Sequence, residues 1–194
     1  MSAPVARRAT YQDLLAVPED TRAEIIAGEI RVAPAPLPKH SRALRALGSY
    51  IGRPFDDDHG KGGPGGWWIL VEVDVQLGEH DIVRPDVAGW RRERLPEPWD
   101  VRPIMTVPDW ICEITSPSNV AHDRLVKAQL YAEHDVPHFW LLDPAERLLE
   151  SFTLSARVWT RTGCYGDDAI ARVAPFEEVE LDVGALFPPK PSMV

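Results

Sequence analysis

Two carboxylates and one lysine between residues 84 and 143 are the residues whose types and order best fit a chemical step. Asp86 opens a predicted strand, Glu113 lies late in the next strand, and Lys127 lies inside the helix that follows. Carboxylates can hold a divalent metal that activates water, and an ammonium can offset the charge that develops on a phosphate. If the three side chains converge, they suit metal-dependent cleavage of phosphodiester bonds.

The elements that carry these residues are arranged so that convergence is possible. Glu113 interrupts the apolar run 110–114 and shares a strand face with Ile111 and Thr115, because side chains alternate along a strand. An ionised carboxylate on an apolar strand is costly unless it is paired or binds a metal. Ser118 or Asn119 then provides a helix N-cap, and a helix that returns over the sheet can direct Lys127 toward the strand ends.

The ordered set of motifs resembles the Uma2 family, formerly a domain of unknown function, within the PD-(D/E)XK nuclease superfamily. The matching segments are Pro85-Asp86-Val87, residues 113–118, Asp123 with Lys127 and Tyr131, residues 136–143, residues 24–29 and His40. The resemblance covers about residues 10–187. It implies an α/β (mixed α+β) fold with a restriction-endonuclease-like central mixed β-sheet flanked by helices. We expect one such domain at 10–187, a flexible arm at 1–9 and a tail at 188–194.

The resemblance also implies the chemistry of the site. Asp86, Glu113 and the backbone carbonyl of Ile114 are the expected ligands of Mg²⁺ or Mn²⁺, which prefer oxygen donors. Asp86, Glu113 and Lys127 are the expected catalytic residues. The superfamily usually has its lysine two residues after the glutamate, where this chain has Thr115. The resemblance therefore implies that the lysine is displaced onto the following helix.

Three further residues are candidates for supporting roles near the metal. Glu29 matches a family position as a third acidic group, whereas Glu24 across the same predicted hairpin is interpreted as an exposed carboxylate. His40 lies on the buried stripe of a helix, so it either points at the acidic cluster or is a satisfied histidine at the edge of the core. Asp74 either lies near Asp86 or is an ordinary carboxylate at a strand edge.

Two more candidates flank the lysine on its helix. Asp123 lies one turn before Lys127 and Tyr131 one turn after it, so both could hold the ammonium in position. The hydrophobic periodicity along the chain predicts the other elements. We expect a hairpin at 22–32, helices at 39–51 and 121–134, central strands at 67–77, 82–90, 110–114 and 139–142, and antiparallel strands at 148–154 and 157–162.

Composition limits the classes that remain. The 194 residues suit one domain, and no apolar run approaches the roughly 20 residues that span a bilayer, so we expect no membrane partner. The two cysteines are too few for a disulfide framework, which favours a cytoplasmic location. The formal net charge of -9 opposes nucleic-acid binding in general, because phosphate neutralisation dominates that affinity. The resemblance nevertheless implies a nucleic-acid partner, DNA rather than RNA, and a homodimer.

Other functions fit the sequence less well. A catalytically inactive nuclease-fold protein that acts as a binding or assembly module stays open, and the acidic composition favours it. The glycine-rich run 60–66 lacks the Ser or Thr that follows lysine in a P-loop, and the acidic run 56–59 is interpreted as a solvated loop. A serine or cysteine hydrolase is disfavoured because the chain has no Gly-x-Ser-x-Gly motif and Cys112 is predicted to be buried.

Overall fold

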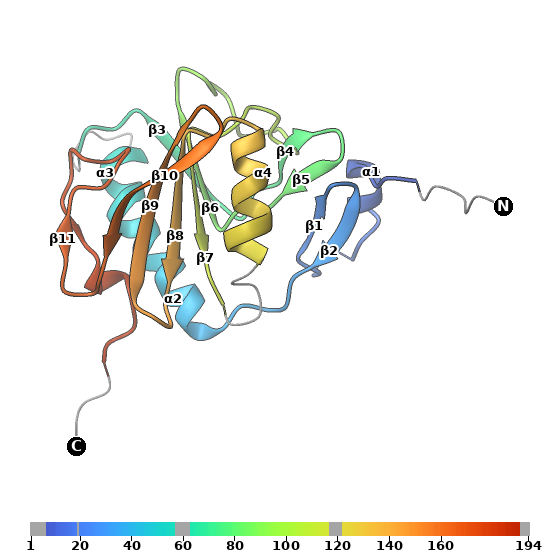
Figure 1. Cartoon of the computed structure of the whole chain (residues 1–194). Coiled ribbons are helices and arrows are strands. Elements are labelled where there is room, and N and C mark those ends of the chain that lie inside the picture. Colours follow the sequence, from blue (N-terminus) through green and yellow to red (C-terminus); the bar gives the residue numbers. More distant parts are fainter. Residues whose placement is uncertain (1–6, 19, 57–62, 117–121, 191–194) are drawn as a thin grey trace.

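A six-stranded sheet forms the centre of the computed structural model, which describes residues 7–18, 20–56, 63–116 and 122–190 (Figure 1). The strand order is β10-β9-β8-β7-β6-β3. These strands are β3 (Trp67–Val71), β6 (Val87–Arg91), β7 (Trp110–Ile114), β8 (His138–Asp143), β9 (Leu148–Ser155) and β10 (Val158–Tyr165). β7 and β8 are parallel and the other neighbours are antiparallel. The predicted mixed α/β architecture is thus confirmed.

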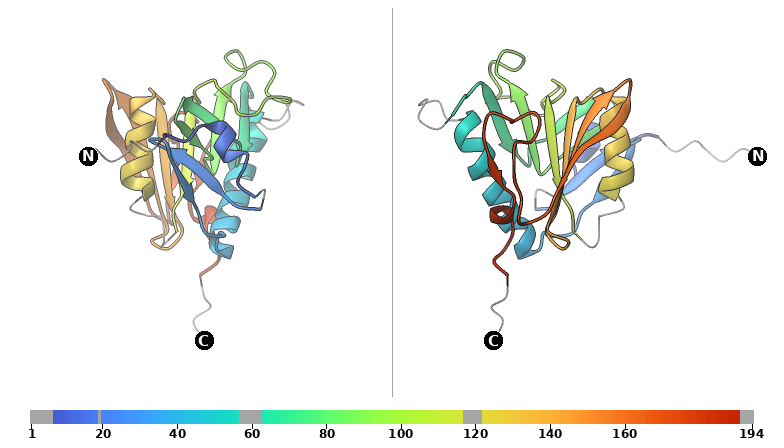
Figure 2. Two further views of the ribbon diagram at one scale, coloured as in Figure 1. Left: turned by 90° about the vertical axis from the view of Figure 1, so that its right-hand side faces the viewer. Right: turned by 60° about the vertical axis from the view of Figure 1, so that its left-hand side comes forward.

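Helices cover both faces of this sheet (Figure 2). On one face α2 (Pro38–Leu47) continues through η1 (Gly48–Gly52) into α3 (Arg53–Asp56), and its apolar residues pack with Trp110, Cys112 and Ile114. On the other face η2 (His122–Lys127) leads into α4 (Ala128–Glu133), whose Leu130 and Tyr131 pack with Ile111. Because Glu113 shares the Ile111 face of β7, its carboxylate is directed toward the layer that contains Lys127.

A smaller sheet with the order β2-β1-β5-β4 lies beside the central one. Its strands are β1 (Ala23–Ile26), β2 (Glu29–Val32), β4 (Val75–Gly78) and β5 (Asp81–Val83). The turn between β1 and β2 uses positive φ angles at Ala27 and Gly28, which suits a two-residue hairpin. The hairpin predicted at 22–32 is therefore confirmed, and β1 carries Glu24 toward the central sheet.

Short elements complete the chain at its two ends. α1 (Tyr11–Leu14) follows Thr10, which forms a capping box with Asp13. Near the C-terminus β11 (Ile170–Ala171) pairs with β12 (Leu181–Asp182), and η3 (Gly184–Leu186) follows. Within the described ranges, no helix has the length and apolarity needed to cross a bilayer.

Two expected strands are each divided in the structure. The continuous strand predicted at 67–77 is wrong, because Glu72 adopts a φ of 52° between β3 and β4, and β4 joins the smaller sheet. The continuous strand predicted at 82–90 is also wrong, because the chain leaves β5 at Arg84-Pro85 and enters β6 only after Asp86. Pro85 has no N–H to donate to a strand ladder. The break places Asp86 at the junction of the two sheets.

The two predicted helices are present with different bounds. The helix expected at 39–51 runs from Pro38 to Asp56 through the η1 segment, with Leu47 and Ile51 buried and Leu44 half-buried. The helix expected at 121–134 is described from residue 122, and its candidate N-cap residues Ser118 and Asn119 lie outside the described residues.

Candidate functional site

Asp86 directly precedes β6, and Glu113 lies on β7, the adjacent strand of the central sheet. Val87 pairs with Cys112 in the antiparallel β6–β7 ladder. Asp86, just before Val87, therefore lies next to Glu113, just after Cys112, at one end of the strands. The backbone N–H of Ile114 donates to Asp86 Oδ2 at 2.7 Å. Both carboxylate side chains are only 2% exposed. The structure thus places the carboxylates of Asp86 and Glu113 at the same end of the sheet, and it is the N–H of Ile114, not its carbonyl, that contacts Asp86.

Lys127 reaches the same end of the sheet from the helical layer. Its Nζ lies 2.8 Å from Glu113 Oε1 and 2.8 Å from Glu24 Oε1. The Tyr131 hydroxyl, one turn later, also donates to Glu113 Oε1. The lysine side chain is only 4% exposed, so these carboxylates replace the water that an ammonium normally binds. The displaced lysine therefore lies beside Glu113, with Tyr131 as a shared neighbour.

Two cationic or potentially cationic groups contact Asp86. Arg22 Nη2 lies 2.5 Å from Asp86 Oδ1, and its Nη1 lies 3.0 Å from Glu72 Oε1. His40, from α2, places Nε2 at 3.1 Å from the same Asp86 oxygen. His40 thus points at the acidic cluster, which was one of its two interpretations. Arg22 was not identified from the sequence, although it lies just before a strand whose Glu24 is two residues away on the same face.

Glu24 is buried, and the expectation that it is an exposed hairpin carboxylate is wrong. Its Oε1 accepts a hydrogen bond from the backbone N–H of Arg84 at 2.7 Å as well as contacting Lys127. These two partners compensate for the loss of water on burial. A carboxylate that lies among three buried apolar residues of β1 gives little sequence signal, because its partners come from residues 60 or more positions away.

The environment separates the pKa values of the two central carboxyl groups. Burial alone would raise the pKa of Asp86, but the hydrogen bond from His40 and the charges of Arg22 and Lys127 lower that pKa to about 2. Burial raises the pKa of Glu113 to about 7, with Asp86 and Glu24 adding to the increase against the opposing effect of Lys127. Asp86 is therefore ionised at neutral pH, whereas Glu113 exchanges its proton near pH 7.

The donor set fits a divalent cation that keeps several water or substrate ligands. Within the described ranges, no group of three or more His, Cys, Asp or Glu side chains is arranged to hold a metal. Mg²⁺ is commonly bound through only one or two carboxylates, so Asp86 and Glu113 suffice. Two buried polar atoms at this cluster, His40 Nδ1 and Thr115 Oγ1, have no hydrogen-bond partner among the described residues. Buried polar atoms normally have a hydrogen-bond partner, which can be a protein group or an ordered water.

The remaining supporting candidates lie elsewhere or outside the described residues. Glu29 is on the exposed strand β2, where its side chain is 73% exposed and contacts Arg31 at 3.2 Å. Asp74 contacts Arg84 and Arg102 instead of the metal ligands. The backbone of Asp123 belongs to η2, but its side chain lies outside the described residues. The structure therefore does not bring Glu29 or Asp74 to the cluster.

The ion pairs of Asp74 give an expected pH dependence of stability. Burial opposes ionisation of Asp74, but hydrogen bonds from Arg102 and Arg84 lower its pKa below the ordinary value of about 3.9. A lowered pKa gives stability that is present above the unfolded pKa and is lost as pH falls toward the folded one. We expect Asp74→Asn to reduce the free energy of unfolding by about 2 kcal/mol at pH 7, and by less below about pH 4. Urea unfolding of both proteins across this pH range measures the difference in the free energy of unfolding. A difference that stays constant down to pH 3 would contradict the lowered pKa of Asp74.

Comparison with known proteins identifies a family over most of the chain. The model of the Uma2 family, described as "putative restriction endonuclease", matches residues 8–184. The chain belongs to the Uma2 family. The Uma2 match spans both sheets and all the residues that converge at Asp86 and Glu113. Its description supports a nuclease function for this Uma2 chain. Among curated proteins, none matches the chain.

A solved structure resembles the Uma2 chain over nearly its whole length. It is the crystal structure from Anabaena variabilis ATCC 29413 of a protein described as a "putative nuclease belonging to DUF820". The two share 23% sequence identity and a TM-score of 0.68, with 92% of this chain and 97% of that one covered. At this identity the likeness shows a shared fold, which is restriction-endonuclease-like.

Proposed function

We propose that this Uma2 chain is a Mg²⁺- or Mn²⁺-dependent endonuclease that hydrolyses phosphodiester bonds in nucleic acid. One observation carries the proposal: Asp86, Glu113 and Lys127 come from three separate segments and meet at one end of the sheet. Lys127 lies 2.8 Å from Glu113, and Asp86 accepts a hydrogen bond of 2.7 Å from the backbone of Ile114, the residue after Glu113. Burying two acids and a lysine together is costly for stability, which points to a functional reason for the cluster.

Each residue has a distinct role in this proposal. Asp86 and Glu113, with the Ile114 carbonyl, would hold the ion. When bound, the ion supplies Lewis-acid chemistry that polarises the scissile phosphate and lowers the pKa of a water. Lys127 orients the attacking water and offsets negative charge at the phosphorus while the bond to the leaving oxygen breaks. Glu24 and Tyr131 restrict the position of Lys127 through the contacts already described.

The partner we propose is DNA in preference to RNA, and the protein would act as a homodimer in the cytoplasm. Family membership supports nucleic acid as the substrate. The net charge of -9 limits non-specific attraction to phosphate, so binding would rely on local contacts near the site. We therefore expect low salt to be needed for measurable binding.

One observation favours a second function, a non-catalytic nuclease-fold module that binds or assembles. Asp86 already contacts the side chains of Arg22 and His40, and it accepts a hydrogen bond from the Ile114 N–H. Glu113 likewise contacts Lys127 and Tyr131. A cluster that is internally compensated in this way can be purely structural. Under this alternative the protein would bind no divalent ion and cleave no substrate.

A cleavage assay separates the two functions. Single- and double-stranded DNA and RNA are incubated in low salt with Mg²⁺, Mn²⁺ or EDTA, using wild type, Glu113→Gln and Glu29→Gln. We expect cleavage that requires metal and falls at least about 100-fold in Glu113→Gln, because a metal ligand is lost. Glu29→Gln is the matched control and should retain activity, since its exposed side chain lies away from the cluster. Equal activity in all three proteins would reject the assigned site, and an inactive wild type would favour the module.

A further inference from the structure

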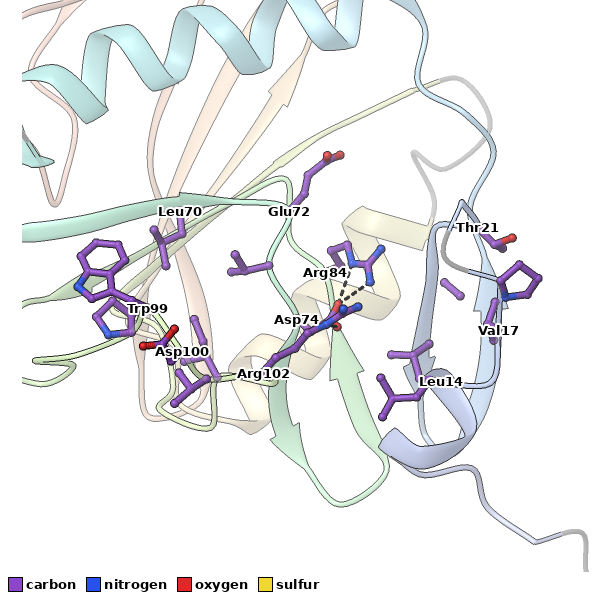
Figure 3. Close-up of a pocket in the computed structure, with 17 residues that line it drawn as sticks. Leu14, Val17, Thr21, Leu70, Glu72, Asp74, Arg84, Trp99, Asp100 and Arg102 are labelled. Carbon is purple, nitrogen blue, oxygen red and sulfur yellow. Dashed lines mark hydrogen bonds and ion pairs between the residues drawn. The ribbon is translucent and has the colours of Figure 1, made fainter.

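A cavity of about 760 Å³ lies next to the candidate site, between the N-terminal segment and the loop that precedes β7 (Figure 3). Its volume is within the range of about 300–1,000 Å³ typical of sites for organic ligands. Apolar side chains of Leu14, Val17, Leu70 and Ile104 form much of its lining. The polar lining residues are fewer and include Asp74, Arg84 and Arg102.

Trp99 gives one wall of this cavity an exposed aromatic surface. The residue is 59% exposed, although its ring packs edge-on against Trp68 with the centroids 4.7 Å apart. Trp68 is itself fixed, because its indole N–H donates to the Leu95 carbonyl at 2.8 Å and the Arg92 guanidinium lies 3.7 Å from its ring centroid. Trp99 is therefore a supported indole with surface available for stacking, a contact that suits any nucleobase.

Arg102 provides a guanidinium that is fixed at Asp74 in the same cavity. Its Nε lies 2.8 Å from Asp74 Oδ2, while the side chain as a whole is 62% exposed. Arg84 contacts the other Asp74 oxygen at 2.7 Å, so two arginines compensate one buried carboxylate. Figure 3 shows Trp99, Asp100 and Arg102 on the same side of the cavity. A guanidinium held through Nε can offer its remaining N–H groups to a phosphate.

The cavity is connected to the candidate site by direct contacts. Glu72 lines the cavity, and Arg22 forms ion pairs with both Glu72 and Asp86. Its Nη1 lies 3.0 Å from Glu72 Oε1, and its Nη2 lies 2.5 Å from Asp86 Oδ1. Arg84, on the cavity floor, precedes Asp86 by two residues. Asp86 and Glu113 are themselves buried, so a nucleotide held in this cavity would lie beside the less buried Arg22 edge of the cluster.

We propose that this cavity binds the unpaired base of a nucleic-acid strand, which stacks on Trp99 while Arg102 contacts a neighbouring phosphate. A paired base is stacked inside its duplex and cannot present its face to an indole, so the substrate would be a single strand or an unpaired region. A base is uncharged, and adenine, cytosine and guanine have amino donors, so these bases suit a cavity that also contains Asp100 and Glu72. This inference rests on the proposed function, since it specifies the strand state of the same substrate.

Fluorescence anisotropy of a labelled single-stranded oligonucleotide, and of the blunt duplex of the same sequence, tests this proposal in EDTA and low salt. We expect Trp99→Ala to weaken single-strand binding about tenfold and duplex binding much less, because stacking on one base is lost. Trp99→Phe should retain most of the affinity. Met105→Ala is the matched control, since Met105 is 72% exposed in the same loop and does not line the cavity. Arg102→Ala should weaken binding and reduce its salt dependence, whereas Arg157→Ala, another exposed arginine, should do neither.

Three outcomes would overturn the assignment of the cavity. They are an equal effect of Trp99→Ala and Met105→Ala, an equal loss for single strand and duplex, or no single-strand binding by the wild type. Thermal melting of each variant shows whether the fold is intact. If Trp99→Ala does not fold, Trp99→Leu replaces it, because leucine keeps apolar volume but cannot stack on a base. If metal-dependent cleavage is lost in Glu113→Gln but Trp99→Ala binds single strands as well as the wild type does, only the proposed role of the cavity is refuted. If the wild type binds single strands through Trp99 but cleaves no substrate, only the proposed nuclease activity is refuted.

Discussion

Lys127→Met is expected to lower metal-dependent cleavage by about 100- to 1,000-fold, the usual effect of removing one electrostatic contact from a transition state. Methionine keeps most of the volume of the side chain but removes the ammonium that lies 2.8 Å from both Glu24 and Glu113. The same change leaves two buried carboxylates with less compensation, so we also expect a loss of about 3–5 kcal/mol in the free energy of unfolding. Initial rates on the preferred substrate and urea unfolding measure the two effects.

A compensated pair of variants separates catalysis from folding in this experiment. Glu24→Gln removes one of the two carboxylates, so the double variant Glu24→Gln/Lys127→Met should be more stable than Lys127→Met alone. The drop in rate from Glu24→Gln to the double variant is then assigned to the lysine. If the double variant is folded and cleaves within about threefold of Glu24→Gln, Lys127 has no catalytic role.

Mn²⁺ is expected to stabilise the wild type against thermal unfolding, because the ion binds the folded cluster and not the unfolded chain. At a free concentration of about 100 times Kd the gain is about 2.7 kcal/mol. Asp86→Asn should abolish the gain, since it removes the carboxylate whose pKa of about 2 keeps it ionised at neutral pH. Differential scanning calorimetry with and without Mn²⁺ measures the increment for each protein.

Asp74→Asn is the matched control for the metal experiment. Asp74 is also a buried aspartate that contacts two cationic side chains, but those partners are Arg84 and Arg102 at the neighbouring cavity. Its Mn²⁺ increment should equal that of the wild type. A wild type without any shift at millimolar Mn²⁺, or an increment lost equally in Asp74→Asn and Asp86→Asn, would contradict binding at Asp86.

Local patterns were sufficient to predict the elements that carry Glu113 and Lys127, but not the break at Asp86. A short apolar run with one carboxylate is a strong signal for a buried strand, and β7 has the predicted bounds and is buried throughout. The catalytic role expected for Lys127 rests on the family resemblance, because a helical lysine alone is usually exposed. The convergence of the three residues follows from the order of strand, strand and helix.

The missed features depend on contacts between distant segments. Periodicity continues across Glu72 and across Pro85, so it could not indicate that β4 and β5 leave the central sheet for a second one. The hairpin offers Glu24 and Glu29, and the sequence does not tell which of them meets the cluster. Glu24 is buried because Arg84 and Lys127 approach it from elsewhere. Arg22 was missed for the same reason, since its partner Asp86 is 64 residues away.

A crystal structure of the wild type with Mn²⁺, phased to locate the ion by its anomalous scattering, tests the central claim most directly. The account predicts one peak about 2.0–2.2 Å from oxygens of both Asp86 and Glu113, with Lys127 still within reach of the same carboxylate cluster. Arg22 should have moved away from Asp86 Oδ1, because two cations cannot share that oxygen at the distances required. An ion bound only at other carboxylates, or no ion at millimolar Mn²⁺ with Arg22 still on Asp86, would contradict the account.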